Sequence, residues 1–322
     1  MIGLFLLTLR ELRARKVVVG LFVVATVIWV AFAFALQLDI VDGSLAGARL
    51  FGQETVEEGP THAPGDVMLD DAGQPILGDD GTPRTYGDEL PFGASTLLES
   101  VVFTAQAFVS GAAYWIGILL ALFATGGLVA SLTERGQVDV ILTKPLSRSQ
   151  VLGGRLLAVG AVMLALVTYL FGAVWLVMSI KSGIWSPRFL LAILVVWAMF
   201  AVVYSIVTLV GVWSGSGPLS FIVTLGVVFV SLILAIPDLA LQVNRFWRPV
   251  VVGAYHLLPK FGSVGTTLVP QLATGGSVGS LYALASSLLF GTVLYALAFF
   301  LFSRKDLAPC SPPPGPHESP SR

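Results

Sequence analysis

Few residues in this chain have the types and spacing needed for chemistry. Residues 275–279 match G-x-S-x-G, which in hydrolases places a nucleophilic serine on a turn between a strand and a helix. Here a glycine-rich segment leads into a long apolar run, so the required strand is not expected. The histidines, His62, His256 and His317, are scattered without the H-E-x-x-H spacing of a zinc site, and no G-x-x-x-x-G-K-[ST] phosphate loop occurs. We therefore expect no catalytic, metal or cofactor site in this chain.

Ionisable side chains are also scarce inside the apolar runs. Glu99, Lys181 and Arg188 fall at the ends of these runs. The polar residues in the interiors are neutral, namely Gln106, Tyr114, Tyr169 and Tyr204. An acid, lysine or histidine at membrane depth usually marks a proton or ion pathway. A proton-driven carrier is therefore not favoured, whereas sodium binding by backbone carbonyls stays open.

The composition indicates the class of protein that must position these residues. Hydrophobic residues make up 56% of the 322 residues and charged residues 11%, where soluble domains carry roughly a quarter. Runs of about 20 apolar residues can each cross roughly 30 Å of hydrocarbon as a helix. The sequence predicts an all-α polytopic membrane protein with six spans: 17–38, 102–130, 156–180, 189–213, 219–237 and 280–302. The net charge of -1 offers no electrostatic basis for binding nucleic acid.

The distribution of lysine and arginine predicts the orientation of the spans. Basic residues cluster before the first span, after the second and after the sixth, at Arg10, Arg13, Arg15, Lys16, Arg135, Lys144, Arg148, Arg155, Arg304 and Lys305. Residues 39–100 instead hold Arg49 and Arg84 against thirteen acidic residues. Because basic flanks stay on the cytoplasmic side, both termini are predicted to be cytoplasmic. We expect a multi-pass protein of the bacterial inner membrane, that is, the plasma membrane.

Five segments lie outside the predicted spans: 1–16, 39–101, 131–155, 238–279 and 303–322. The first is expected to form an amphipathic helix on the inner membrane surface over about residues 2–15. The external loop of residues 39–100 is predicted to form solvated turns and a β-hairpin or irregular cap around a short apolar run at residues 76–78. Its paired aspartates lack the EF-hand alternation, so a calcium site is not favoured. The tail is proline-rich and expected to be disordered.

The external segment 238–279 is too apolar for an ordinary loop. Pro249, Pro259 and Pro270 interrupt it too often for one straight span. Short re-entrant or interfacial helices are therefore expected. The alternative is that this segment adds a further pair of membrane spans. Lys260 lies within this segment, in the run LLPKF.

The cytoplasmic segment 131–155 is the most informative part of the chain. Residues 147–150 have the form of a capping box, so a helix is expected to begin near Arg148. Before Pro145, an apolar stripe of Val138, Ile141 and Leu142 follows helical spacing among polar residues. Such a short amphipathic helix can lie on lipid headgroups or dock in a protein groove.

The order of residues in this segment resembles a known family. Glu134, Gly136, Leu142, Pro145, Ser147-Arg148 and Gly154-Arg155 are similar to the cytoplasmic loop of ABC-2 type transporter permeases. The branch with permeases of nitrous-oxide-reductase maturation and gliding motility is the most similar. Arg155 stands where this branch usually has lysine, which keeps the charge. The runs RELRARK, LLPKF and SRKDL around the first and last spans add to the resemblance.

This resemblance implies a permease subunit driven by a separate cytoplasmic ATP-binding subunit, which would hold ATP and magnesium. Two permease chains, identical or different, would pair in the bilayer, and the direction of transport would be export. Residues 134–144 would be the coupling helix seated in a groove of the ATPase. The residues expected to contact or position that partner are Glu134, Gly136, Val138, Ile141, Leu142, Pro145, Ser147 and Arg148.

Two other classes of function remain open from the sequence. A secondary carrier or channel would keep transporting after ATP depletion. A membrane scaffold that transports nothing would bind a partner without any nucleotide-dependent change of conformation.

Overall fold

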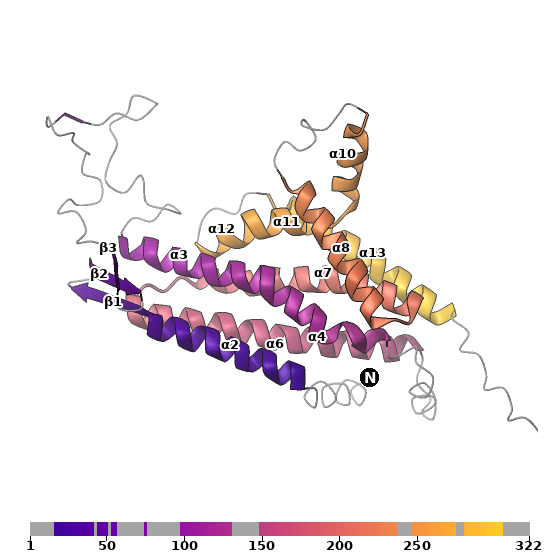
Figure 1. The fold of residues 1–322 in the computed structure, drawn as a ribbon, viewed down its shortest axis with the longest axis horizontal. Helices are drawn as coiled ribbons and strands as arrows, with labels where there is room; N and C mark the ends of the chain where they lie inside the picture. Colours follow the sequence, from indigo (N-terminus) through magenta and orange to yellow (C-terminus); the bar gives the residue numbers. More distant parts are fainter. Residues whose placement is uncertain are drawn as a thin grey trace, which may run out of the picture.

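The computed structural model describes residues 16–41, 44–50, 53–56, 74–75, 97–130, 148–236, 246–274 and 280–304. These residues form a bundle of long helices with a small antiparallel sheet at one end (Figure 1). The predicted all-α polytopic membrane class is confirmed. Within the described residues, five helices are long and apolar enough to cross a membrane, and α2 (Lys16–Ala35) contains a shorter apolar stretch, Val18–Ala31.

The long helices follow the predicted spans closely but differ from them at their ends. After α2 come α3 (Leu97–Ala112), the π-helical turn η2 (Ala113–Gly117) and α4 (Ile118–Ala130), which run on from one another. The next spanning elements are α6 (Arg148–Ser182), η4 (Pro187–Leu190) with α7 (Leu191–Ser214), α8 (Gly217–Leu234) and α13 (Tyr282–Arg304). Helix α6 begins at Arg148, where the capping pattern places a helix start.

The turn between α7 and α8 follows from its glycine and proline residues. Gly215 has a φ of 68°, in the left-handed region, and its N–H donates to the carbonyl of Gly211 at 2.9 Å, which ends α7. The side chain of Ser216 then accepts from the N–H of Leu219, with Pro218 in the first turn of α8. Two long helices are thereby joined with almost no intervening loop.

Helix α7 forms the centre of the bundle and is the most buried of the spanning helices. The indole N–H of Trp197 donates to the carbonyl of Gly160 in α6 at 2.9 Å. From α13, the hydroxyl of Tyr295 donates to the carbonyl of Ala201 at 2.8 Å. Helices α4 and α8 pack on α7 as well. In a bilayer such polar contacts between apolar helices supply specificity that hydrophobicity cannot.

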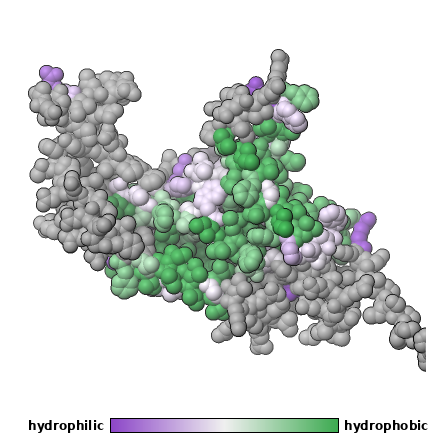
Figure 2. Space-filling model, in the orientation of Figure 1, coloured by the Kyte–Doolittle hydropathy of each residue, from purple (hydrophilic) through white to green (hydrophobic). Residues whose placement is uncertain are grey.

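Helix α8 turns its polar side inward. Its buried residues are Ser220, Thr224, Val228 and Ser231. The hydroxyls of Ser220 and Thr224 donate to carbonyls one turn earlier, at 2.7 Å each, so they are satisfied within the helix. The opposite side carries exposed apolar residues, including Ile222, Phe229 and Ile233. Apolar side chains likewise cover much of the helical surface in Figure 2, which suits contact with lipid tails.

Helix α2 lies parallel to α6. The hydroxyls of Thr26 and Tyr169 lie 2.9 Å apart, and the indole N–H of Trp29 donates to Tyr169 at 3.0 Å. Near the far end of the pair, the Lys181 ammonium donates to the carbonyl of Ala33. Both helices therefore run in the same direction, as expected of the first and third spans.

The sheet follows α2 without a gap. Strands β1 (Leu36–Val41), β2 (Ser44–Leu50) and β3 (Gln53–Val56) pair antiparallel in that order, with Leu36 opposite Leu50 (Figure 1). The helix thus ends at Ala35, before the predicted boundary at residue 38. The hairpin predicted around residues 76–78 lies outside the described residues.

Between α8 and α13, the described residues 246–274 form short helices, each too short to cross a membrane. They are α10 (Arg248–Leu257), α11 (Phe261–Ser263), the π-helical turn η5 (Val264–Leu268) and α12 (Val269–Ala273). Pro249 and Pro270 lie in the first turns of α10 and α12, and Pro259 separates α10 from α11. Helix α10 projects from the bundle, while α11 packs on α8 and α12 packs on α3 and α7 (Figure 1). We call residues 258–273 the broken segment.

Candidate functional site

Most residues of the predicted coupling element lie outside the described part of the chain. These are Glu134, Gly136, Val138, Ile141, Leu142, Pro145 and Ser147. Arg148 is the first residue of α6. Helix α4 ends at Ala130 and α6 begins at Arg148, both toward the same end of the bundle (Figure 1).

Arg155 lies in the protein interior, two turns into α6, and is 5% exposed. Gly153, also in α6, packs against α13, where a Cβ atom added to it would come within 3.7 Å of the Phe299 ring. The start of α6 and the end of α13 are therefore in contact at this end of the bundle. A buried arginine at this position belongs to the packed interior and not to a solvated loop.

At its start, the broken segment is held to the bundle by three hydroxyl groups. Ser231 of α8 donates to the carbonyl of Pro259 at 2.5 Å and accepts from the N–H of Phe261 at 3.0 Å. Ser287 of α13 accepts from the N–H of Lys260 at 2.9 Å. Tyr114 completes the set from η2, donating to the carbonyl of Phe261 at 2.6 Å. Backbone groups that a proline-broken chain leaves unpaired are thus satisfied by three spanning elements.

Aromatic packing reinforces these bonds. The Phe261 ring stacks on Tyr114 with centroids 4.6 Å apart and meets Trp115 edge-on at 5.4 Å. One turn further, Gly265 approaches so closely that a Cβ atom there would lie 2.5 Å from Tyr114 and 2.6 Å from Trp115. Two π-helical turns, η2 and η5, therefore face each other. Such turns are rare and frequently occur at functional sites.

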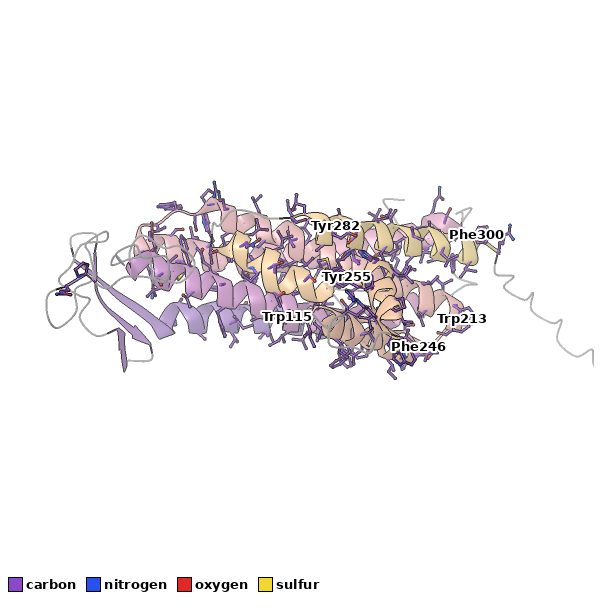
Figure 3. The ribbon with its side chains drawn as sticks, turned by 90° about the horizontal axis from the view of Figure 1, so that it is seen from above. Trp115, Trp213, Phe246, Tyr255, Tyr282 and Phe300 are labelled. Atoms are coloured by element: carbon purple, nitrogen blue, oxygen red, sulfur yellow. The ribbon has the colours of Figure 1, made fainter. Side chains whose placement is uncertain are left out.

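Lys260, near the start of the broken segment, is charged and only 3% exposed. Its ammonium group donates to the hydroxyl of Ser286 at 3.0 Å and lies 4.8 Å and 4.2 Å from the ring centroids of Tyr255 and Tyr282. Both tyrosines appear in Figure 3, one from α10 and one from α13. His256 Nδ1 lies 3.2 Å from the Tyr282 hydroxyl. Burial lowers the pKa of Lys260, an effect that the adjacent Tyr255 opposes.

The structure brings together residues that the sequence left apart. Tyr114 bonds to Phe261, whereas Gln106 bonds to Ser186 at 3.2 Å and Tyr169 bonds to α2. In the sequence, Lys260 could be noticed because it is a charged residue between proline and phenylalanine in an apolar segment. Nothing in the sequence indicated that Tyr114 would contact Phe261, the next residue. The described residues contain no group of three His, Cys, Asp or Glu side chains that could hold a metal ion.

The arrangement is thus a bundle of long apolar helices with a broken segment held against η2, α8 and α13. A family model described as ABC-2 family transporter protein matches residues 7–307, nearly the whole chain. The chain belongs to the ABC-2 transporter family. No curated protein matches this ABC-2 protein. Members of the family are membrane transport subunits and not themselves catalysts, and they normally work with an ATP-binding subunit.

Membership in the family, together with the five long apolar helices among the described residues, supports a multi-pass membrane protein. It does not distinguish branches of the family, so the similarity to permeases of nitrous-oxide-reductase maturation and gliding motility stays a prediction. The eight coupling residues stay predictions as well.

Proposed function

We propose that this ABC-2 protein is the permease subunit of an exporter in the bacterial inner membrane, driven by a separate cytoplasmic subunit that binds ATP and magnesium. Two permease chains would pair in the membrane, either as identical copies or as two different chains. The observation that carries the proposal is the family match over residues 7–307 of a chain whose spanning helices contain one acidic residue, Glu99. A transporter with so few acidic residues in its spanning helices is expected to take its energy from another subunit and not from a proton pathway of its own.

Helix α6 offers a direct mechanical connection between the two sides. It has 35 residues, which corresponds to roughly 52 Å at 1.5 Å per residue and exceeds the roughly 30 Å of hydrocarbon. It begins immediately after residues 131–147 and packs on α7 at the centre of the bundle. A force applied to the coupling segment would therefore be transmitted along one continuous helix into the core.

The ends of the helices support a cytoplasmic location for both termini. The start of α2, the end of α4, the start of α6 and the end of α13 lie toward the same end of the bundle (Figure 1). Among the described residues, this end carries Lys16, Arg148, Arg155 and Arg304, whereas Lys181, Arg188 and the sheet lie at the opposite end. Under the positive-inside rule, the basic end faces the cytoplasm.

The broken segment would form part of the outer barrier of the export path. Its bonds reach η2, α8 and α13, so a movement of any of these elements strains the contacts at Pro259, Lys260 and Phe261. Alternating access requires a barrier that opens when the helices move, and this arrangement couples the two events.

The test is a substitution in the predicted coupling helix of the complete transporter. Leu142→Asp places a charge on the apolar stripe, and we expect substrate-stimulated ATPase activity to fall to background while membrane insertion is unchanged. Leu142→Met, which keeps the apolar surface, should retain most of the activity. Full ATPase stimulation in Leu142→Asp would refute the coupling assignment.

A second experiment separates this proposal from the other two classes of function. A mild-detergent pull-down of the tagged chain should recover a subunit with a phosphate-loop sequence, and transport should stop when ATP is depleted. Transport that continues without ATP would indicate a carrier or channel. A tight partner without nucleotide-dependent change would indicate a scaffold.

A further inference from the structure

Four polar side chains meet where the external segment joins α13. Lys260 and Ser286 are in hydrogen-bond contact, and His256 and Tyr282 form the rim beside them. We propose that these four residues, the headgroup site, bind the phosphate of a phospholipid from the outer leaflet. The site is independent of the ATPase partner, so it goes beyond the export function.

The chemistry of the site favours an anion. Among the described residues, Lys260 forms no ion pair, and its charge is balanced only by a hydroxyl and two aromatic faces. Removing a lysine ammonium from water without an opposite charge is costly. A phosphate group would supply that charge and accept hydrogen bonds from the ammonium, the Tyr282 hydroxyl and the His256 ring.

The site is accessible from its rim. Tyr282 is 55% exposed and His256 is exposed, whereas the Lys260 ammonium lies behind the Tyr282 ring. An anion can therefore contact the tyrosine hydroxyl and the imidazole first. It would reach the ammonium after a change in the Tyr282 side-chain rotamer, without unfolding the broken segment.

The position of the site favours a lipid over a soluble anion. Tyr282 is the first residue of α13, so the site lies at the level where a spanning helix begins. Helix α10 runs across the direction of the long helices and has no buried residue, as expected of a helix in the membrane interface (Figures 1 and 3). Trp247 and Tyr282 supply the aromatic side chains typical of that depth.

Apolar side chains flank the polar group on both elements. Leu257 follows His256 and is 73% exposed, and Leu281 precedes Tyr282 and is 56% exposed. Leu289 lies one turn beyond Ser286 on α13 and is also exposed. They are placed to contact acyl chains while the headgroup occupies the polar site. This combination of a buried cation, hydroxyl donors and adjacent apolar surface matches an anionic amphiphile.

The test measures binding to the purified full-length chain, labelled with a fluorophore at Cys310, the single cysteine. The probes are dioctanoyl phosphatidylglycerol, dioctanoylglycerol without phosphate, and inorganic phosphate. We expect saturable binding of the phospholipid alone. Lys260→Gln should weaken it about tenfold, in line with the loss of a charge-assisted hydrogen bond, and Lys260→Arg should retain it.

Arg304→Gln is the matched control, because Arg304 also lies over an aromatic ring, that of Phe300, at the other end of α13. Its binding should equal that of the wild type. His256→Ala and Tyr282→Phe alter exposed side chains, and each should weaken binding about threefold even if Lys260→Gln fails to fold.

Wild-type affinity in both rim variants, or in a folded Lys260→Gln, would overturn the headgroup site. Equal binding of dioctanoylglycerol would show that acyl chains alone are recognised and would also overturn it. Inorganic phosphate binding as tightly as the phospholipid would overturn the assignment to lipid.

Discussion

The hydroxyl of Tyr114 donates a 2.6 Å hydrogen bond to the backbone carbonyl of Phe261, joining the middle of the second spanning element to the broken segment. Their rings also stack. The Tyr114 side chain thereby satisfies the hydrogen-bonding capacity of a backbone carbonyl in the broken segment and packs its ring on the Phe261 ring. Any movement of η2 is transmitted to the broken segment through this pair.

Tyr114→Phe is expected to loosen the broken segment while preserving the stacked rings. Loss of the hydroxyl leaves the Phe261 carbonyl without that donor and should cost about 1 kcal/mol of stability. In a Cys310→Ser background, a cysteine placed at the exposed Thr267 should react faster with a membrane-impermeant maleimide. Tyr295→Phe removes a similar bond between α13 and α7 and should not change this rate. Equal acceleration in both variants would contradict the specific role of Tyr114.

Gly265→Ala is expected to disturb the contact between the two π-helical turns. The added Cβ atom would lie 2.5 Å from Tyr114, so η5 and η2 must separate, at a cost of about 1–3 kcal/mol. Thermal unfolding in detergent should show a lower Tm. Gly253→Ala in α10 meets nothing within 4 Å and should leave the Tm unchanged or slightly raised. A Gly265→Ala protein as stable as Gly253→Ala would refute the close packing.

Ser231→Ala tests the hydroxyl that holds the start of the broken segment. Its loss leaves the Phe261 N–H and the Pro259 carbonyl without this partner, and we expect a destabilisation of about 1–3 kcal/mol. Ser220→Ala, on the same face of α8, removes only a bond to the preceding turn and should cost little. The difference in Tm between the two variants measures the anchor. No difference would mean that the segment is held by its aromatic contacts alone.

The lowered pKa of Lys260 predicts a dependence of stability on pH in the alkaline range. Between its lowered pKa in the fold and its ordinary value of 10.5, the unfolded chain binds more protons than the folded chain. Stability should therefore rise with pH across this interval, and the contribution of Lys260 should not vary with pH below it, where both states are protonated. Tyr255 and Tyr282 also titrate near pH 10, so the quantity to follow is the Tm of wild type minus that of Lys260→Gln. A difference that stays constant or falls with increasing alkalinity would contradict a pKa lowered by burial.

The single cysteine provides a test of the orientation. Cys310 follows α13, so a membrane-impermeant thiol reagent should label it in inverted vesicles but not in intact cells. Labelling of intact cells would reverse the predicted topology. It would also remove the coupling segment from the side on which ATP is available.

Much of the fold was predictable because the relevant signals are local. The apolar runs located the long helices, and the pattern at residues 147–150 placed a helix start at Arg148, where α6 begins. Prolines at 249, 259 and 270 indicated that the helices between α8 and α13 would be short, as the described residues show. Less predictable was the end of α2 at Ala35, because Leu36 and Leu38 follow the apolar run although they belong to β1.

The sequence by itself determined the membrane class, the approximate spans and the coupling hypothesis, since hydrophobic run length, helix capping and charge asymmetry act over a few residues. Only the tertiary structure decided that Phe261 meets Tyr114, that Gly265 lies against two aromatic rings and that Lys260 is buried beside Tyr282. Lipid tails and protein interiors are similarly apolar, so a hydropathy pattern cannot say which face of a helix meets which neighbour. Those contacts depend on how hydroxyls, rings and glycines far apart in the chain fit together once the helices have packed.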